Sequence, residues 1–250
     1  MTLWEDLRFY HEAHSGRPII DLFKAEGRAE NFSIAAGGLY FDYSKTSIDP
    51  HARELLIRLA EASHLASRRD AMFAGEKINE TENRAGLHTA LRNIDASVMV
   101  DGSDVMPEVR ATHARMEAFA RDIREGRITG QGGRITDVVN IGIGGSDLGP
   151  AMAAIALSPY ADGPRAHFVS NVDGAHVHDV LAGLNPATTM IVVASKTFTT
   201  IETMTNAETA RRWMADKIAD PAAQFAAVST AAITTSVSAT AHSAAAISAS

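Results

Sequence analysis

The sequence predicts an α/β fold, in which a parallel β-sheet flanked by helices follows a mainly helical amino-terminal extension. In the second half of the chain, four short apolar runs alternate with stretches at helical spacing, an alternation typical of parallel βαβ units. The predicted strands are Asp137–Ile141, Ala166–Ser170, Met190–Ala194 and Gln224–Val228. We therefore expect the extension to occupy residues 1–130 and the sheet domain to occupy residues 131–230.

Two helices are clearly marked in the extension. Asp49 and Pro50 suit an N-cap and a first helical position, and apolar residues follow at spacings of three and four. A second helix is expected from near Pro107 to Gly126, because glycine readily adopts the left-handed conformation that ends a helix. A short hairpin is expected at residues 32–41, where two adjacent glycines mark a turn.

Residues 81–92 carry a polar cluster whose role the sequence leaves open. Arg84, His88 and Arg92 recur at a spacing of four, so they would share one face of a helix, with Glu82 nearby. A buried polar network and a support for a neighbouring functional site are both compatible with this composition.

The composition argues against several classes of protein. A formal net charge of −7, from 23 basic and 30 acidic residues, argues against a nucleic-acid-binding surface, which is ordinarily basic. The absence of cysteine excludes disulfides, thiolate catalysis and cysteine-bound zinc. His176 and His178 have the spacing of a metal pair on a strand, but we expect them on a helix, pointing different ways and holding no metal. The amino terminus shows no signal-peptide pattern and no run of about 18 apolar residues occurs, so we expect a cytoplasmic protein without membrane contact.

A glycine-rich loop, Gly142–Gly149, follows the first predicted strand. Glycines let the backbone approach a ligand closely, and the N–H groups of a following helix favour an anion. The loop departs from the dinucleotide fingerprint because Asp147 stands where the third glycine would be, and it lacks the Gly-Lys-Ser/Thr of a nucleotide-triphosphate loop. A tight strand-to-helix turn without a ligand is the alternative interpretation.

A second loop, Ser195–Thr200, follows the third predicted strand. It holds four hydroxyls and one ammonium within six residues, a donor set that suits a phosphate dianion. The alternative is that Thr199 or Thr200 merely caps the next helix. Because ligands of open parallel sheets bind beyond the carboxyl ends of the strands, the two loops together favour a phosphate site.

Four segments, in order along residues 1–229, resemble the glucose-6-phosphate isomerase (phosphoglucose isomerase) family. Thr81–Arg92 resembles the family's tENRavLHxALR stretch, and Val139–Pro150 resembles its NIGIGGSxLGP loop. Ser170–Gly174 resembles its SNvDG turn, and Ser195–Asn206 resembles its SKTFTTxETmxN phosphate loop. Four ordered motifs, two of them long, make a chance similarity very improbable.

The resemblance implies sugar-isomerase domains of the αβα sandwich type. It also implies the reversible conversion of glucose 6-phosphate to fructose 6-phosphate, an aldose–ketose isomerisation through an enediol in glycolysis and gluconeogenesis. The family needs no metal or organic cofactor. Its full-length members are homodimers, an expectation that we do not extend to this chain. The residues that match the family's phosphate and substrate contacts are Ser195, Lys196, Thr197, Thr200, Gly145 and Ser146.

The sequence also departs from the family pattern. The family's arginine motif, glutamate base, ring-opening histidine and carboxyl-terminal lysine have no counterpart here. Residues 231–250 are uncharged and consist mostly of Ala, Ser and Thr, so we expect them to be disordered or foreign to the fold. We therefore expect no catalytic residue in this chain, which would be an inactive fragment of the enzyme. The alternative hypothesis is a regulatory module that binds phosphosugars without catalysis.

Overall fold

The computed structural model describes residues 2–229, which form two compact units. The first unit extends to Ala74, and the second begins at Gly75. Among the described residues, no helix is both long and apolar enough to cross a membrane. The expectation for residues 231–250 lies outside the described residues.

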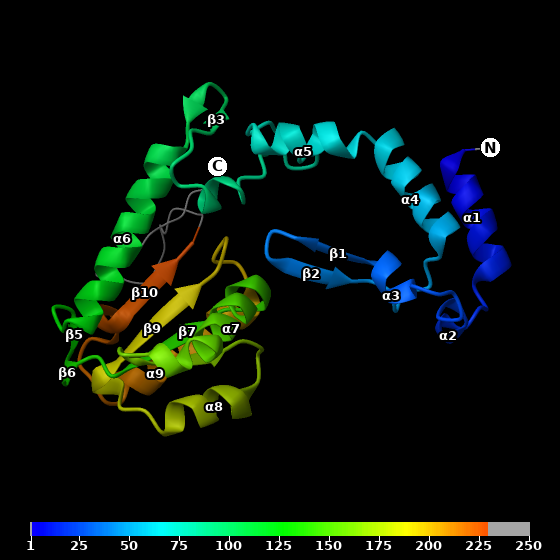
Figure 1. Cartoon of the computed structure of the whole chain (residues 1–250). Coiled ribbons are helices and arrows are strands. Elements are labelled where there is room, and N and C mark those ends of the chain that lie inside the picture. Colours follow the sequence, from blue (N-terminus) through cyan, green and yellow to red (C-terminus); the bar gives the residue numbers. More distant parts are fainter. Residues whose placement is uncertain (1, 230–250) are drawn as a thin grey trace. The chain divides into compact units, whose positions relative to one another are not determined.

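The amino-terminal unit combines helices with one exposed hairpin (Figure 1). Its elements are α1 (Leu3–His14), α2 (Ile19–Leu22), α3 (Arg28–Asn31), β1 (Ser33–Ala36), β2 (Leu39–Asp42), α4 (Pro50–Ala62) and α5 (Leu65–Phe73). The predicted hairpin is confirmed, and its turn needs two glycines because Gly37 and Gly38 have φ angles of 58° and 78°. The predicted start of α4 is also confirmed, with Asp49 accepting from the Ala52 N–H at 2.9 Å.

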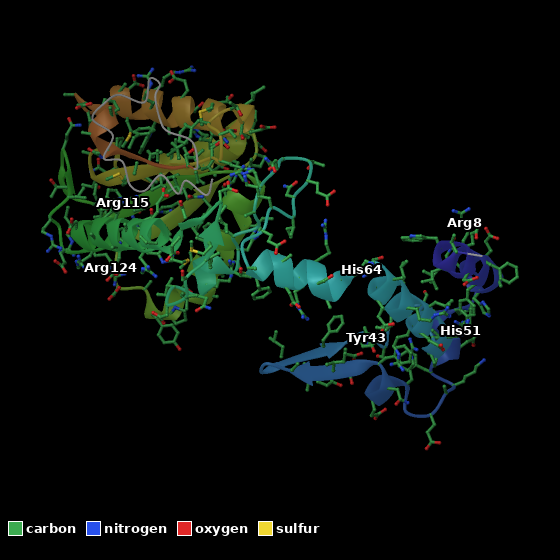
Figure 2. All side chains as sticks on the ribbon, turned by 90° about the horizontal axis from the view of Figure 1, so that it is seen from above. Arg8, Tyr43, His51, His64, Arg115 and Arg124 are labelled. Atoms are coloured by element: carbon green, nitrogen blue, oxygen red, sulfur yellow. The ribbon has the colours of Figure 1, made fainter. Side chains whose placement is uncertain are left out.

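Asp49 is the centre of a polar network that ties α1 to α4. Its carboxylate accepts from the Tyr10 hydroxyl at 2.5 Å and from the Arg17 guanidinium at 2.8 Å. Tyr10 in turn lies against His51, with ring centroids 4.7 Å apart. His51, labelled in Figure 2, belongs to α4. Burial alone would raise the pKa of Asp49, but these hydrogen bonds outweigh it and lower the pKa to about 2. The network therefore holds this carboxylate in its charged form.

The second unit is built on a four-stranded parallel sheet in the order β10-β9-β7-β8 (Figure 1). Its strands are β7 (Asp137–Ile141), β8 (Arg165–Val169), β9 (Thr189–Ala194) and β10 (Phe225–Val228). Its helices are α6 (Met106–Arg124), α7 (Leu148–Ala156), α8 (Gly174–Ala182) and α9 (Ile201–Ala215). Two small hairpins complete it: β3 (Met99–Val100) with β4 (Ser103–Asp104), and β5 (Thr129–Gly130) with β6 (Gly133–Arg134). The α/β prediction and all four strands are confirmed, with strand limits shifted by no more than one residue.

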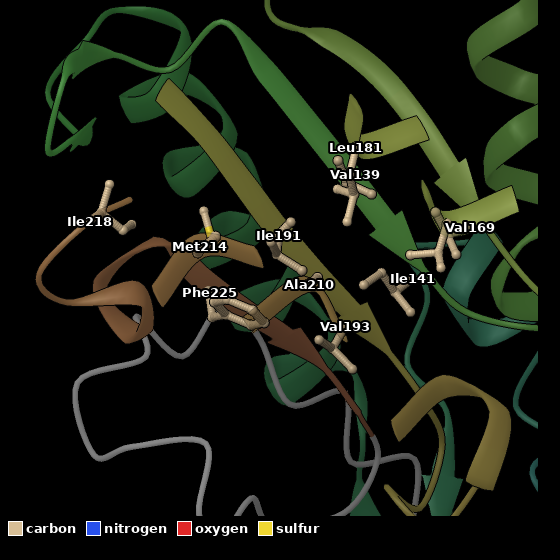
Figure 3. Packing of buried hydrophobic residues seen from close by; sticks show 11 residues of the cluster. Val139, Ile141, Val169, Leu181, Ile191, Val193, Ala210, Met214, Ile218 and Phe225 are labelled. Atoms are coloured by element: carbon tan, nitrogen blue, oxygen red, sulfur yellow. The ribbon is translucent and has the colours of Figure 1, made fainter. Parts of the chain in front are cut away.

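The two faces of the sheet pack against different helices, as the alternation of side chains along a strand requires. Val139, Ile141, Ile191 and Val193 contact the α8 and α9 side, where Leu181 and Met214 complete one core (Figure 3). The intervening strand residues pack with Ile123 of α6 in a second cluster: Val138, Met190, Val192 and Ala226. The sheet thus lies between two helical layers.

The strand order contains a topological switch point. The chain passes from β7 to β8 on one side, and then crosses to β9 on the other side of β7. Ile141, the last residue of β7, pairs with Val193 of β9, one residue before that strand ends. The loops after β7 and β9 therefore begin side by side, at the position where open α/β sheets bind ligands.

The predicted helix over residues 81–92 is wrong. Asn79 forms an antiparallel bridge with Arg84, and Asn83 has a φ angle of 52°, so the backbone turns here instead of coiling. The Asn79 side-chain oxygen accepts from the Thr81 hydroxyl at 2.8 Å and from the Glu82 N–H at 3.2 Å. Such short-range bonds from side chains compete with helical hydrogen bonds.

Only the end of that segment is helical, as a single 3₁₀ turn at Ala90–Arg92. Arg84 lies 3.8 Å from the Glu82 carboxylate, while Arg92 donates to the His88 carbonyl at 2.9 Å. The side chains of Glu82, Arg84 and Arg92 therefore make local contacts along their own segment. Because the segment is not helical, Arg84, His88 and Arg92 do not share one helical face.

Candidate phosphate-binding site

The glycine loop after β7 folds back tightly on itself. A Cβ atom at Gly142 would lie 2.7 Å from the carbonyl oxygen of Ser146, so no side chain fits there. Asn140 of β7 donates to that same carbonyl at 2.9 Å and holds the loop closed. Gly144 has a φ angle of 58°, in the left-handed region that favours glycine. The loop therefore exposes Gly145, above which a Cβ atom would meet nothing within 4 Å.

Replacing Gly142 with alanine is expected to lower the free energy of unfolding of the sheet unit by about 2 kcal/mol, because the added methyl group would displace the Ser146 backbone. Urea titration followed by circular dichroism measures this change. Gly145→Ala is the matched control, since its methyl group points into open space, and its unfolding midpoint should stay close to that of the unmodified chain. Equal stability of the two variants would contradict this account of the loop.

The loop after β9 is ordered by Ser195. This residue is 5% exposed, its N–H donates to the Val228 carbonyl at 3.0 Å, and its Oγ accepts from the Phe198 N–H at 3.1 Å. Phe198 has a φ angle of 55°, which bends the chain sharply and turns residues 196 and 197 outward. The Ser195 hydroxyl hydrogen is not used in these bonds.

The remaining residues of this loop present donors at the surface. Lys196 and Thr197 are exposed, and the Thr197 and Thr199 hydroxyl oxygens are 2.6 Å apart. Thr200 occupies the N-cap position of α9, but its side chain makes no capping hydrogen bond. The capping interpretation of Thr200 is therefore wrong. The first N–H groups of α9 and the hydroxyls beside them form a set of donors that suits an anion.

Three polar residues at this edge were not singled out by the sequence. Asn140 is a polar residue within the apolar run Val138–Ile141, and this interruption could have identified it as a candidate from the sequence. Thr203 and Asn206 lie on the buried face of α9, at 1% and 3% exposure, where helical spacing would place apolar residues. Asn206 donates to the carbonyls of Ser170 and Asn171, and so ties the turn after β8 to α9. The buried Thr203 hydroxyl has no hydrogen-bond partner among the described residues.

A second polar cluster lies at the opposite edge of the sheet. Asp137, at the start of β7, accepts from Arg165 at 3.1 Å and from Thr136 at 2.8 Å, and its other oxygen lies 2.9 Å from His167. Burial would raise the pKa of Asp137, but these partners outweigh burial and lower it. We interpret this cluster as a structural network that joins β7 to β8. Within residues 2–229, no group of three or more metal-ligating side chains is assembled, and His176 and His178 flank the buried Val177 on α8.

A comparison with protein-family models decides the family. The model described as "Phosphoglucose isomerase" matches residues 42–241, which is most of the chain. The chain belongs to the phosphoglucose isomerase family. The match continues to residue 241, beyond residue 230, where we expected the resemblance to end.

Individual members of the phosphoglucose isomerase family agree with this assignment. The chain is 69% identical over 229 residues to a glucose-6-phosphate isomerase of Cereibacter sphaeroides, and 60% identical over 228 residues to one of Jannaschia sp.. These alignments cover 92% and 91% of this chain but only 43% and 42% of the relatives. The chain thus spans less than half the length of the curated relatives that it matches.

The fold agrees with a solved member of the phosphoglucose isomerase family. A crystal structure of a glucose-6-phosphate isomerase from Chlamydia trachomatis superimposes with a TM-score of 0.71 at 26% identity. The superposition covers 92% of this chain and 44% of that one. The expected resemblance, and with it a fold of the sugar-isomerase type, is confirmed.

Proposed function

We propose that this chain binds the phosphate group of a hexose 6-phosphate at the switch point between β7 and β9. One observation carries the proposal: two loops rich in hydrogen-bond donors begin at the ends of adjacent parallel strands, at the same edge of the sheet. Ser195, Lys196, Thr197 and Thr200 would hold the phosphate, and Gly145 and Ser146 would contact the sugar from the neighbouring loop.

The geometry suits a dianion for three reasons. Hydroxyls and backbone N–H groups can donate hydrogen bonds to the phosphate oxygens and carry no negative charge that would repel them. The Lys196 ammonium adds a charge-assisted hydrogen bond. The amino terminus of α9 contributes a favourable dipole beside the loop. Gly145 leaves open space for a ligand, because no described atom lies where its side chain would be.

For the enzyme family we propose the reaction that the relatives' names state, the interconversion of glucose 6-phosphate and fructose 6-phosphate. In such an isomerisation a base moves a proton between C1 and C2 through an enediol, while the phosphate lies at the far end of the substrate. Binding energy from that remote group orients the reacting carbons, so the loops of this chain would contribute to positioning and not to proton transfer. The regulatory-module alternative is not favoured, since the Cereibacter sphaeroides and Jannaschia relatives, whose alignments cover 92% and 91% of this chain, are both named glucose-6-phosphate isomerase.

We further propose that the protein acts in the cytoplasm, that it binds no nucleic acid, and that it uses no cofactor. Its net charge of −7 supports the second of these points, because nucleic-acid-binding surfaces are ordinarily basic. A homodimer is proposed for full-length members of the family, and not for this chain.

Binding and turnover measured on the purified 250-residue chain test the proposal together. We expect calorimetry to detect the binding of fructose 6-phosphate and to show that inorganic phosphate competes for the same site. Unphosphorylated fructose should give no detectable binding. We expect no conversion of glucose 6-phosphate in a coupled assay. The segments that resemble the family include its phosphate-binding loop but not its proton-transfer residues. Equal binding of fructose and its phosphate would contradict the phosphate site. Turnover that persists after removal of host isomerase would contradict the second expectation.

A further inference from the structure

A groove of about 710 Å³ lies between α8 and α9, on the face of the sheet opposite α6. It is lined by residues from the turn after β8 and from both helices, among them Asp173, Val177, His178, Leu181, Asn206 and Trp213. Neither the Ser195–Thr200 loop nor the Gly142–Gly149 loop contributes to its lining. The groove is therefore separate from the proposed phosphate site.

The floor of the groove is apolar. Val177 and Leu181 of α8 are 5% and 4% exposed and belong to the main core, and Trp213 of α9 packs against the same cluster. A ligand with a flat apolar body would bury its surface against these side chains. Aromatic rings and ammonium groups both pack favourably on an indole face.

The rim of the groove offers hydrogen-bond acceptors. Asp173 uses one carboxylate oxygen, Oδ1, to cap α8 through the N–H groups of residues 175 and 176, at 2.9 and 3.3 Å. Its other oxygen accepts no hydrogen bond from a described residue. Asn206 is 3% exposed, and its Nδ2 is held by the carbonyls of Ser170 and Asn171 at 3.2 and 3.0 Å. Because that amide nitrogen is held, the orientation of the side chain is set, and no residue of the described chain donates to its Oδ1.

The charge of the lining selects the kind of ligand. It contains one carboxylate and one imidazole, and no lysine or arginine is among the lining residues. An anion would meet Asp173 without a compensating cation, whereas an ammonium group could donate to both Asp173 and Asn206. We propose that this groove is a binding site for a small organic ammonium compound whose apolar body packs against Trp213 and the α8 side chains.

Three probes of the same shape test the charge preference: benzylamine, benzyl alcohol and benzoate, each added to the full chain at pH 8. The chain has two tryptophans, so two indole N–H signals are expected in the ¹H–¹⁵N spectrum, and a Trp213→Phe variant assigns them. We expect benzylamine to shift the Trp213 signal with a dissociation constant of about 1 mM, typical of a fragment, and to leave the Trp4 signal unchanged. Benzoate should cause no saturable shift, and benzyl alcohol should bind more weakly than benzylamine.

Asp173→Asn provides the decisive variant, because asparagine caps a helix as well as aspartate and so leaves α8 intact. We expect it to weaken benzylamine binding about threefold to tenfold. Asp179→Asn, an exposed residue of α8 outside the groove, is the matched control and should bind like the unmodified chain. Saturating glucose 6-phosphate should not displace the probe. Equal affinity for benzoate, an unchanged Asp173→Asn variant, or displacement by the sugar phosphate would each overturn the proposal.

Discussion

Replacing Lys196 with methionine is expected to weaken the binding of fructose 6-phosphate by about 10-fold to 100-fold, as the loss of one charge-assisted bond to a phosphate predicts. Methionine keeps most of the apolar stem and removes the ammonium. Lys196 is exposed, and its backbone carbonyl, which accepts from the Ser229 hydroxyl at 3.0 Å, is retained in the variant. The loop should therefore keep its conformation, and isothermal titration calorimetry measures the loss directly.

Lys217→Met is the control for this experiment. Lys217 is likewise exposed but follows the carboxyl end of α9, far along the helix from the phosphate loop. Its substitution changes the net charge equally and should leave the affinity within about twofold, because charge effects across the surface are screened by salt. A similar loss of affinity in both variants would show that overall charge, and not the Ser195–Thr200 loop, governs binding.

Replacing Asp49 with alanine is expected to lower the free energy of unfolding of the amino-terminal unit by about 3–4 kcal/mol. The substitution removes the N-cap of α4 and leaves the Tyr10 hydroxyl and the Arg17 guanidinium without their shared acceptor. Hydrogen exchange over residues 3–62 measures the effect, since protection should fall in this unit. Protection in the sheet unit, which does not contain this network, is the internal control, and an unchanged amino-terminal unit would contradict the role assigned to Asp49.

The same carboxylate makes the amino-terminal unit sensitive to acid. The folded state lowers the pKa of Asp49 from 3.8 to about 2, so its contribution is present above about pH 4 and is lost as the pH falls through about 2. A difference of nearly two units corresponds to about 2.5 kcal/mol. Asp49→Asn keeps the helix cap but cannot titrate, so we expect its stability to vary less between pH 5 and pH 2. Parallel stability curves for the two proteins would count against this linkage.

Most elements of the second unit could be predicted because each one is marked by residues that are close together in the sequence. The strand Asp137–Ile141 and its neighbours are recognisable from a few consecutive apolar residues. Asp49 and Gly126 mark helix ends through interactions with adjacent backbone groups. The two anion-suited loops were also found from donor chemistry alone. The segment 81–92 was mispredicted because Asn79 takes hydrogen bonds that a helix would otherwise use, and periodicity does not report such competition.

By itself, the sequence determined the fold class, the four strands, the donor-rich character of both loops and the resemblance to an isomerase family. These follow from local pattern and composition. Only the tertiary structure decided that β9 lies beside β7, which brings the two loops to one switch point. It also decided that Asn206 joins the turn after β8 to α9 and that α8 and α9 enclose an acceptor-rimmed groove. These features depend on contacts between residues distant in the chain, and such contacts leave no local periodicity in the sequence.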